Sequence, residues 1–251
     1  MHHFTEHRSY FEEPYTRTPF FKALTPERNL SETKALEALC KFSHDDLILD
    51  HGCGQGRHTT QLRADGFAVT GFDYSRILLD MAVEEMNKRK LSIPYVRGNM
   101  PNLPFKDSAF DWVLSLFGSF GYLSDKENIE VLEEIARVLK PGGTLMLDIW
   151  NKEAVLNRYG DDKKHQIGNN EFFIQKCHFD HNLNRMTVNR FFTSPDNEEK
   201  YSVSFRVYTR AEISEILTSL GFEIRDFRGS FESREITPES KSMVIICKKI
   251  G

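Results

Sequence analysis

The chain has 251 residues, of which 39% are hydrophobic and 28% are charged, the composition of an ordinary soluble globular protein. This length can bury one core and carry an added subdomain. The formal net charge of −4 excludes the global basic field with which many proteins attract nucleic acids.

The four cysteines are scattered, and no two of them form a Cys-x-x-Cys pair. This scattered spacing of the cysteines argues against a zinc site or a disulfide framework and fits a protein of a reducing compartment. No uninterrupted apolar run approaches the roughly 18–20 residues that cross a bilayer, and the N-terminus lacks the apolar centre of a signal peptide. We therefore expect a cytoplasmic protein with no membrane contact and no metal.

Residues 1–30 mix aromatic side chains with three prolines. The aromatic residues include Tyr10, Phe11, Tyr15, Phe20 and Phe21. The segment is too apolar for a disordered tail, and its prolines interrupt it too often for one regular helix. Two interpretations stay open, namely a lid that closes over a pocket and a segment that packs into the core.

From Ser31 onwards, helices alternate with short apolar strands. Apolar residues at helical spacing predict helices from Ser31 to Cys40 and over 59–64, 77–90 and 128–139. The predicted strands span 47–50, 67–73, 95–99, 110–115 and 144–149. Such alternation indicates a parallel sheet with helices on both faces. Ligands of such sheets bind where the carboxyl ends of the strands meet.

After Asn151 the pattern changes. Three β segments (171–180, 184–192 and 200–208) follow one another without helices and predict an inserted antiparallel sheet. A helix over 211–220 and strands over 222–231 and 242–248 then complete the α/β scaffold. We expect a mostly parallel, doubly wound sheet of seven strands. The expected division is an N-terminal lid segment (1–30), a core (31–151), an antiparallel β lid (152–208) and the end of the core sheet (209–251).

The strongest motif lies between the first strand and the next helix. The apolar strand ends at Asp50, and glycines follow at alternate positions, Gly52, Gly54 and Gly56. Such a turn lets a ligand approach the backbone, and the first amides of the helix face that ligand unpaired. A dinucleotide motif, Gly-x-Gly-x-x-Gly, is not completed, because Arg57 or Thr59 occupies its third position. A P-loop is excluded because no Gly-Lys-[Ser/Thr] occurs here.

Together with four later segments, this loop resembles the class I S-adenosylmethionine-dependent methyltransferases. Asp50–Gly56 matches the glycine motif of the family, and Asp73 matches the acid that ends the second strand. The other matching segments are Gly98-Asn99-Met100, Leu103-Pro104-Phe105 with Phe110-Asp111, and Arg137–Gly143. Five elements in the family's order cover most of the chain. The resemblance implies a Rossmann-like fold.

The resemblance also implies S-adenosylmethionine as the cofactor and S-adenosylhomocysteine as its product. Asp73 would accept hydrogen bonds from the ribose hydroxyls. Asn99 would accept from the adenine amino group, where the family often has Asp. Asp50 would meet the ammonium of the cofactor. The implied cofactor-binding residues are Asp50, Gly52, Cys53, Gly54, Gly56, Asp73, Tyr74, Asn99, Met100, Leu116 and Phe117.

Two histidines lie in or beside the glycine loop. His51 occupies a position that is usually apolar in the family. It is either a buried, hydrogen-bonded imidazole or a residue that lines the methionine end of the cofactor site. His58 is expected on the first turn of the helix, in a structural role.

The methyl acceptor is expected beyond the fourth strand, near residues 115–122. Methyl transfer from a sulfonium is an in-line displacement that needs a base only when the acceptor arrives protonated. We predict transfer to N or O of a small molecule, with Tyr122 as the catalytic candidate, either a hydrogen-bond partner or a base. The residues predicted to face the acceptor are Tyr10, Tyr15, Trp150, Asn151 and Arg206.

Other functions stay open at this point. The chain could methylate RNA or protein, or it could be a non-catalytic nucleoside-binding scaffold. The acidic net charge disfavours nucleic acid. The intact glycine loop and Asp73 argue against a scaffold that has lost turnover. The oligomeric state is not predicted.

Overall fold

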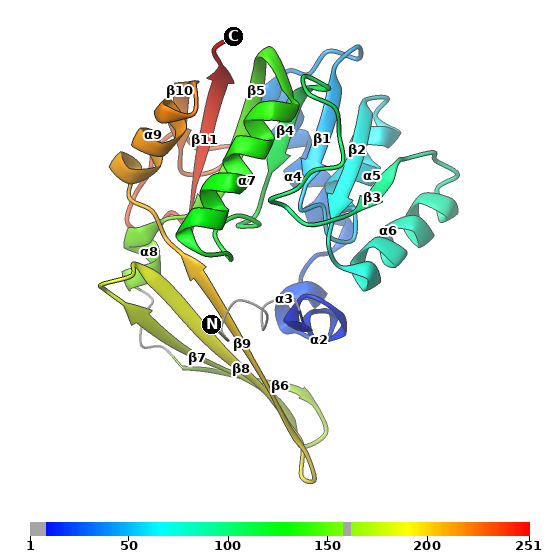
Figure 1. Ribbon diagram of the computed structural model, residues 1–251. Coiled ribbons are helices and arrows are strands. Elements are labelled where there is room, and N and C mark those ends of the chain that lie inside the picture. The colour runs from blue at the N-terminus through cyan, green and yellow to red at the C-terminus, as the bar shows by residue number, and fades with distance from the viewer. Residues whose placement is uncertain (1–8, 158–161) are drawn as a thin grey trace.

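A computed structural model describes residues 9–157 and 162–251 and contains two sheets (Figure 1). The large sheet has the strand order β10-β11-β5-β4-β1-β2-β3, and the small one has the order β6-β7-β8-β9. The strands of the large sheet are β1 (Leu47–His51), β2 (Ala68–Asp73), β3 (Tyr95–Arg97), β4 (Phe110–Ser115), β5 (Leu139–Trp150), β10 (Phe222–Arg228) and β11 (Ser242–Lys249). β1 to β5 pair in parallel, and β11 runs antiparallel to both β5 and β10. The predicted seven-stranded, mostly parallel α/β fold is confirmed.

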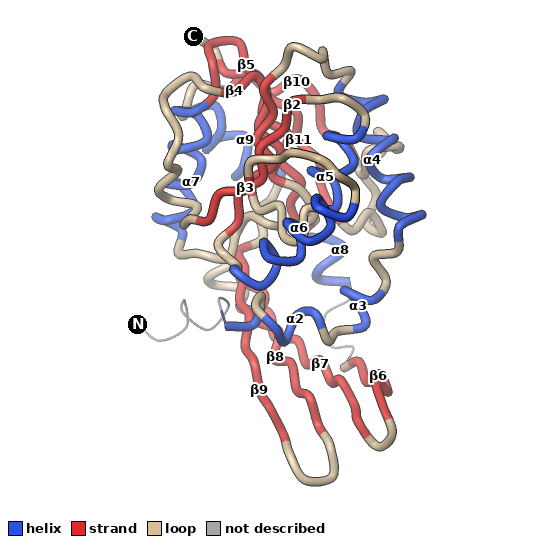
Figure 2. Tube along the Cα trace, turned by 90° about the vertical axis from the view of Figure 1, so that its right-hand side faces the viewer, coloured by secondary structure: helices blue, strands red, loops and turns tan. Residues whose placement is uncertain are grey.

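Helices cover both faces of the large sheet (Figure 2). α7 (Asp125–Val138) and α9 (Arg210–Ser219) lie on one face, and α4 (Pro26–Cys40), α5 (Arg57–Ala64) and α6 (Arg76–Lys88) lie on the other. Successive residues of β5 point to opposite faces, so that Leu145 and Leu147 join one apolar cluster and Met146 joins the other. A strand that is buried on both faces is apolar throughout. Short apolar runs alternating with helices therefore sufficed to predict the fold.

Two helices begin earlier than predicted. α4 begins at Pro26, because Thr25 caps it and proline suits the first helical position. α7 begins at Asp125 with a capping box of Ser124 and Glu127. The first turn of each helix is polar, so the spacing of apolar residues does not predict where the helix begins. The turn predicted over 141–143 does not lie between α7 and β5, because α7 ends at Val138 and β5 begins at Leu139.

The small sheet projects from the core as a separate layer. It consists of β6 (Lys163–Gly168), β7 (Glu171–Asp180), β8 (Arg185–Thr193) and β9 (Glu198–Arg206), one strand more than predicted. β6 was missed because its sequence is mostly polar. The short helix α8 (Lys152–Asn157), also not predicted, precedes the sheet. Residues 1–8 and 158–161, which belong to the expected lid segment and insertion, lie outside the described residues.

Two short helices of the N-terminal segment, α2 (Glu13–Thr16) and α3 (Pro19–Lys22), lie between the core and the small sheet (Figures 1 and 2). Each has proline in its first turn. The prolines therefore divide the segment into single helical turns, as its sequence indicated. This position puts the aromatic residues of the segment over the carboxyl ends of the core strands.

Candidate active site

The glycine loop is held by backbone hydrogen bonds to the neighbouring strand β2. The amides of Gly52 and Cys53 donate to the carbonyl of Phe72 at 2.8 and 3.0 Å. Gly52 has a φ of +83°, and a Cβ there would lie 2.7 Å from Ser119 Cβ. A Cβ on Gly56 would overlap Tyr95 Oη. At these two positions the backbone and its surroundings therefore require glycine.

Asp73 ties the loop to the end of β2. One carboxylate oxygen accepts from the Gly54 amide and the other from the Ser75 amide, both at 2.8 Å. Burial raises the pKa of the Asp73 carboxyl, because the charged form is desolvated there. Each oxygen keeps a second lone pair with which a ligand hydroxyl could bond. The Asp73 side chain thus fixes the conformation of the loop and also offers hydrogen-bond acceptors to a ligand.

Asp50, at the base of the loop, is also buried. Its carboxylate accepts from the hydroxyl of Thr59 at 2.6 Å. Burial raises the pKa of Asp50 to about 6. At neutral pH this carboxylate is ionised and favours a cationic ligand group beside it.

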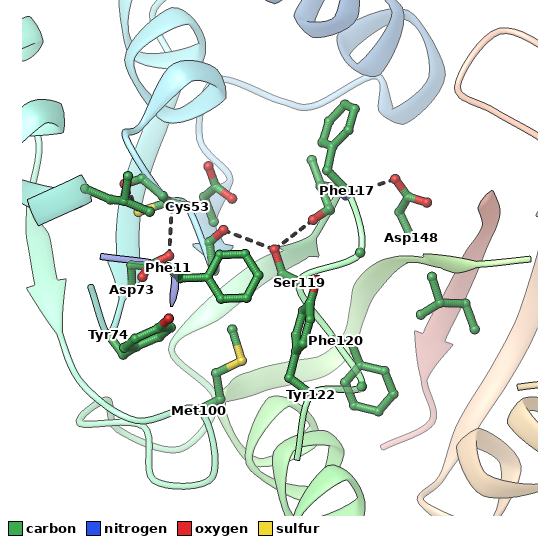
Figure 3. Close-up of a pocket in the computed structure, with 18 of the residues that line it drawn as sticks. Phe11, Cys53, Asp73, Tyr74, Met100, Phe117, Ser119, Phe120, Tyr122 and Asp148 are labelled. Atoms are coloured by element: carbon green, nitrogen blue, oxygen red, sulfur yellow. Dashed lines mark hydrogen bonds between the residues drawn. The ribbon is translucent and has the colours of Figure 1, made fainter. Parts of the chain in front are cut away.

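A cavity of about 530 Å³ opens over the carboxyl ends of the core strands (Figure 3). This size is typical of small-molecule sites. The structure brings together most of the residues predicted from sequence. Those that line the cavity are Tyr15, Asp50, Gly52, Cys53, Gly54, Asp73, Tyr74, Asn99, Met100, Leu116, Phe117, Tyr122 and Trp150.

Four predicted residues lie elsewhere, which corrects their expected place on the cavity wall. Gly56 packs against α6 and Tyr95, so its role is steric. The Asn151 amide donates to two backbone carbonyls, those of Thr237 and Ser240, and so anchors the chain after β5. The remaining two are Tyr10 and Arg206.

Tyr10 and Arg206 are held by contacts that the sequence does not reveal. Tyr10 is buried beneath the guanidinium of Arg190, whose Cζ lies 4.3 Å from the centre of its ring. Arg206 donates to Glu212 at 2.7 Å and also faces Asp125. Both residues attach the lid segments to their surroundings instead of facing a ligand.

Tyr122 lines the cavity but is not suited to act as a base. Burial raises the pKa of its phenol to about 12, so the group is neutral at physiological pH. The ring packs edge-on against Phe11, with 5.1 Å between the ring centroids. The raised pKa disfavours Tyr122 as a base and favours hydrogen-bond donation, the other role predicted for it.

The N-terminal segment lines the cavity and also packs on the core, which confirms the packing predicted for it and leaves the lid a proposal. Phe11, Tyr15 and Phe20 are on the cavity wall. The carboxylate of Glu12 accepts from the Ser75 hydroxyl at 3.0 Å and from the first backbone amides of α6. Among the described residues of β6 to β9, none lines the cavity.

His58 lies on the first turn of α5 as expected, whereas His51 matches neither of its two expected roles. His51 is fully buried and does not line the cavity, and neither ring nitrogen has a hydrogen-bond partner among the residues that the structure describes. His58 does line the cavity, where its ring stacks on Phe117. Burial lowers the pKa of each imidazole to about 4, so both are neutral at physiological pH.

Sequence reasoning also missed charged residues on the cavity wall. Arg28, Arg57 and Asp148 all line it. Arg57 pairs with Glu32 and lies over the ring of Phe117, 4.1 Å from the ring centre. The signal for Asp148 was available, because a single acid within an otherwise apolar strand is seldom buried without a role.

Residues 48–143 match the model of a family described as a methyltransferase domain. YqeM of Bacillus subtilis, a putative methyltransferase, is 26% identical over 227 residues, covering 86% of this chain and 89% of that protein. A solved S-adenosylmethionine-dependent methyltransferase of Clostridium acetobutylicum has a TM-score of 0.79 at 16% identity, over 95% and 97% of the two chains. The sugar N-methyltransferase KedS8 of Streptoalloteichus has a TM-score of 0.61 at 18% identity, over 89% and 87%. At these identities the structural likeness shows the fold.

The part of the chain that the structure describes holds neither a metal cluster nor a membrane-spanning helix. In residues 9–157 and 162–251, no group of three or more His, Cys, Asp or Glu side chains is placed to hold a metal ion. None of the helices in these ranges has the length and apolar character needed to cross a membrane.

Proposed function

Because this chain belongs to the class I S-adenosylmethionine-dependent methyltransferases, we propose that it transfers a methyl group to nitrogen or oxygen of a small molecule. The observation that carries the proposal is one cavity whose wall combines two kinds of residue. One is the glycine loop with Asp73, which we call the cofactor end, and the other is an aromatic wall of Phe11, Tyr15 and Tyr122, which we call the acceptor end.

The loop end fits the shape and charge of the cofactor. Close approach of a ligand to the backbone requires glycine there, and Gly52 leaves no room for a Cβ. Asp73 would bind the ribose hydroxyls, Asn99 the adenine amino group and Asp50 the ammonium. The cofactor supplies the electrophilic methyl group when it is bound.

The chain's own residues would position the acceptor and exclude water. The aromatic wall encloses the acceptor side, and the size of the cavity suits a small molecule better than a polymer. Tyr122 would donate a hydrogen bond to the acceptor. Alignment of the nucleophile with the methyl group then supplies most of the rate, since the leaving thioether is neutral.

Three further observations support the details of this proposal. The fold resembles that of a sugar N-methyltransferase, whose acceptor is a small molecule. All four cysteines are free, as expected for a cytoplasmic protein. The N-terminal segment and the small sheet lie together on the acceptor side of the core, where we propose that they form the lid (Figure 1).

Calorimetric titration with S-adenosylmethionine tests the function. We expect the wild-type chain to bind the cofactor. Asp73→Ala should weaken this binding tenfold or more, because hydrogen bonds to a charged group contribute about 1.5–3 kcal/mol. Asp80→Ala, which removes an exposed acid on α6, is the matched control and should bind normally. Failure of the wild type to bind would overturn the proposal, and unchanged binding by Asp73→Ala would overturn the ribose assignment alone.

A further inference from the structure

Asp148 is a buried carboxylate on the cavity wall that takes no part in the proposed contacts to the cofactor. It lies near the carboxyl end of β5 and is only 3% exposed. One oxygen, Oδ2, accepts from the backbone amide of Phe117 at 2.9 Å (Figure 3). The other oxygen, Oδ1, is buried and has no hydrogen-bond partner among the described residues.

The unpaired oxygen distinguishes Asp148 from the other cavity acids. Both oxygens of Asp73 accept backbone amides, and Asp50 accepts from Thr59. A buried acceptor without a donor costs on the order of 1–3 kcal/mol, which a donor on a ligand would recover. The Ser242 side chain, the Phe117 amide and the Arg57 guanidinium each lower the pKa of Asp148. Burial has the larger effect and raises that pKa to about 6, so the group is ionised at neutral pH.

The strand order places Asp148 on the acceptor side. β5, β4, β1 and β2 are successive neighbours, so β4 separates Asp148 from the glycine loop, and Asp73 lies beyond that loop. Neighbouring strands are about 4.8 Å apart, which puts the Asp148 backbone roughly 10 Å from the loop. A cofactor that extends from Asp73 across the glycine loop would direct its methyl group toward β4. The group that receives the methyl should therefore lie between that loop and β5.

We propose that the acceptor is an amine and that Asp148 Oδ1 binds its nitrogen. This inference rests on the proposed function. The nitrogen lone pair forms the bond to the methyl carbon, while the carbon–sulfur bond breaks and its electron pair goes to sulfur. The nitrogen then carries a positive charge, and one of its N–H protons passes to Asp148. A carboxylate serves this purpose because it pairs with the charge that develops and then accepts the proton.

Two cofactor analogues form a matched pair for the test. In each, nitrogen replaces the sulfur of S-adenosylhomocysteine, and this nitrogen carries either a methyl or a 2-aminoethyl group. The aminoethyl group extends an ammonium to the place that the acceptor nitrogen would occupy. We expect the wild type to bind the aminoethyl analogue at least tenfold more tightly than the methyl analogue, as measured by calorimetry.

Asp148→Asn should abolish this preference and leave the affinity for the methyl analogue within threefold of wild type. The asparagine oxygen can still accept from the Phe117 amide, and binding of S-adenosylhomocysteine shows that the variant is folded. Asp50→Asn is the control on the cofactor side and should weaken both analogues equally.

The inference is overturned if Asp148→Asn weakens both analogues equally, since the carboxylate would then bind the cofactor's own ammonium or only support the fold. It is also overturned if the wild type binds the two analogues equally well, or if Asp148→Asn still prefers the aminoethyl analogue. A wild type that binds none of these compounds, S-adenosylhomocysteine included, would instead refute the proposed function and this inference with it.

Discussion

The two ends of the cavity are built by different kinds of contact. The cofactor end is fixed by backbone hydrogen bonds between the glycine loop and β2, as between Gly52 and Phe72. The N-terminal segment, which carries most of the aromatic wall, is held to the small sheet by side chains that lie far apart in the sequence, such as Arg17 and Glu199, paired at 3.0 Å. Side-chain contacts change with each substitution, whereas backbone hydrogen bonds do not. We therefore propose that specificity varies mainly at the acceptor end.

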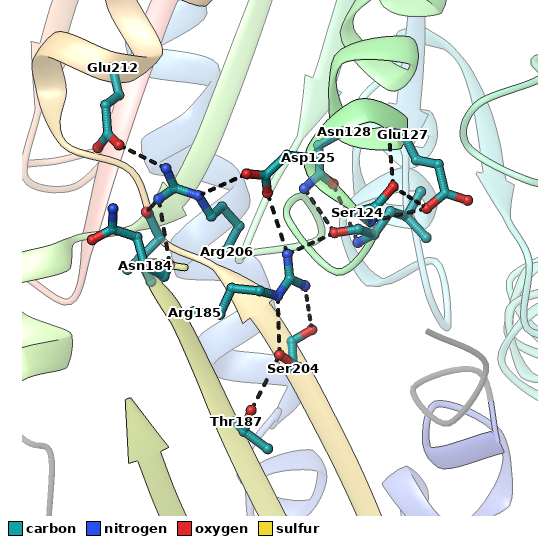
Figure 4. Close-up of polar contacts among 12 residues, drawn as sticks. Ser124, Asp125, Glu127, Asn128, Asn184, Arg185, Thr187, Ser204, Arg206 and Glu212 are labelled. Atoms are coloured by element: carbon teal, nitrogen blue, oxygen red, sulfur yellow. Dashed lines mark hydrogen bonds and ion pairs between the residues drawn. The ribbon is translucent and has the colours of Figure 1, made fainter. Parts of the chain in front are cut away.

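The base of the small sheet shows how the acceptor end is attached (Figure 4). Arg185 on β8 donates to the carbonyl of Leu123 at 2.9 Å, just before α7. Arg206 on β9 pairs with Glu212 on α9, and both arginines face Asp125 at the start of α7. These contacts join the small sheet to two core helices and do not involve the glycine loop. We therefore expect that each end can be perturbed with little effect on the other.

The largest effect is expected at Gly56, on the cofactor end. Gly56→Ala introduces a Cβ that overlaps Tyr95 Oη and lies 2.9 Å from Ala82 Cβ. We expect the free energy of unfolding to fall by about 3 kcal/mol, from overpacking and a left-handed backbone. Gly54→Ala is the matched control, because its φ is also positive but its Cβ would meet nothing closer than 3.8 Å. It should lose only about 1 kcal/mol in the same urea titration. Equal losses would show that the loop relaxes around the added Cβ.

A smaller effect is expected at the base of the small sheet. Arg185 is buried, and its removal breaks its hydrogen bonds to the Leu123 carbonyl and to Ser204, although Asn128 still donates to Leu123. We expect Arg185→Ala to lower the free energy of unfolding by about 2 kcal/mol. Hydrogen exchange should rise in β8 and β9, and the affinity for S-adenosylmethionine should stay within threefold. Arg234→Ala, which removes an exposed ion pair, is the control. A large loss of cofactor affinity in Arg185→Ala would contradict the independence of the two ends.

The smallest effect concerns pH and compares the buried acids Asp50 and Asp148, one at each end. Burial raises the pKa of each to about 6, compared with about 3.9 in an unfolded chain. Well below the unfolded-state pKa both groups are protonated in both states. As the pH rises from about 4 to 6, the groups ionise in the unfolded chain before they ionise in the folded protein, so both reduce the stability of the fold.

Either Asp50→Asn or Asp148→Asn should therefore reduce the loss of stability between pH 5 and 6 by about 1 kcal/mol relative to wild type. Urea titrations at the two pH values measure the difference, and it should be present in the protein without cofactor. An effect in Asp50→Asn but not in Asp148→Asn would mean that water reaches the Asp148 carboxylate.

Most of the fold and the cofactor end could be predicted because their determinants are local. Asp73 was found from its spacing after the glycine loop, and the structure places both beside the same cavity. Helix starts were less accurate, since Thr25 and Ser124 act through caps that apolar spacing does not detect. At the acceptor end, the sequence predicts Arg206 as a ligand contact, whereas in the structure this residue attaches the small sheet to the core.

The sequence by itself determined the parallel sheet, the positions where glycine is needed and the acid that follows the second strand. These depend on backbone conformation over a few residues, and a few residues suffice to encode it. Only the tertiary structure decided which aromatic side chains reach the cavity, that His51 is buried away from it, and that one oxygen of Asp148 has no donor among the described residues. Burial and partner choice depend on segments that meet only after folding, and no local pattern records them.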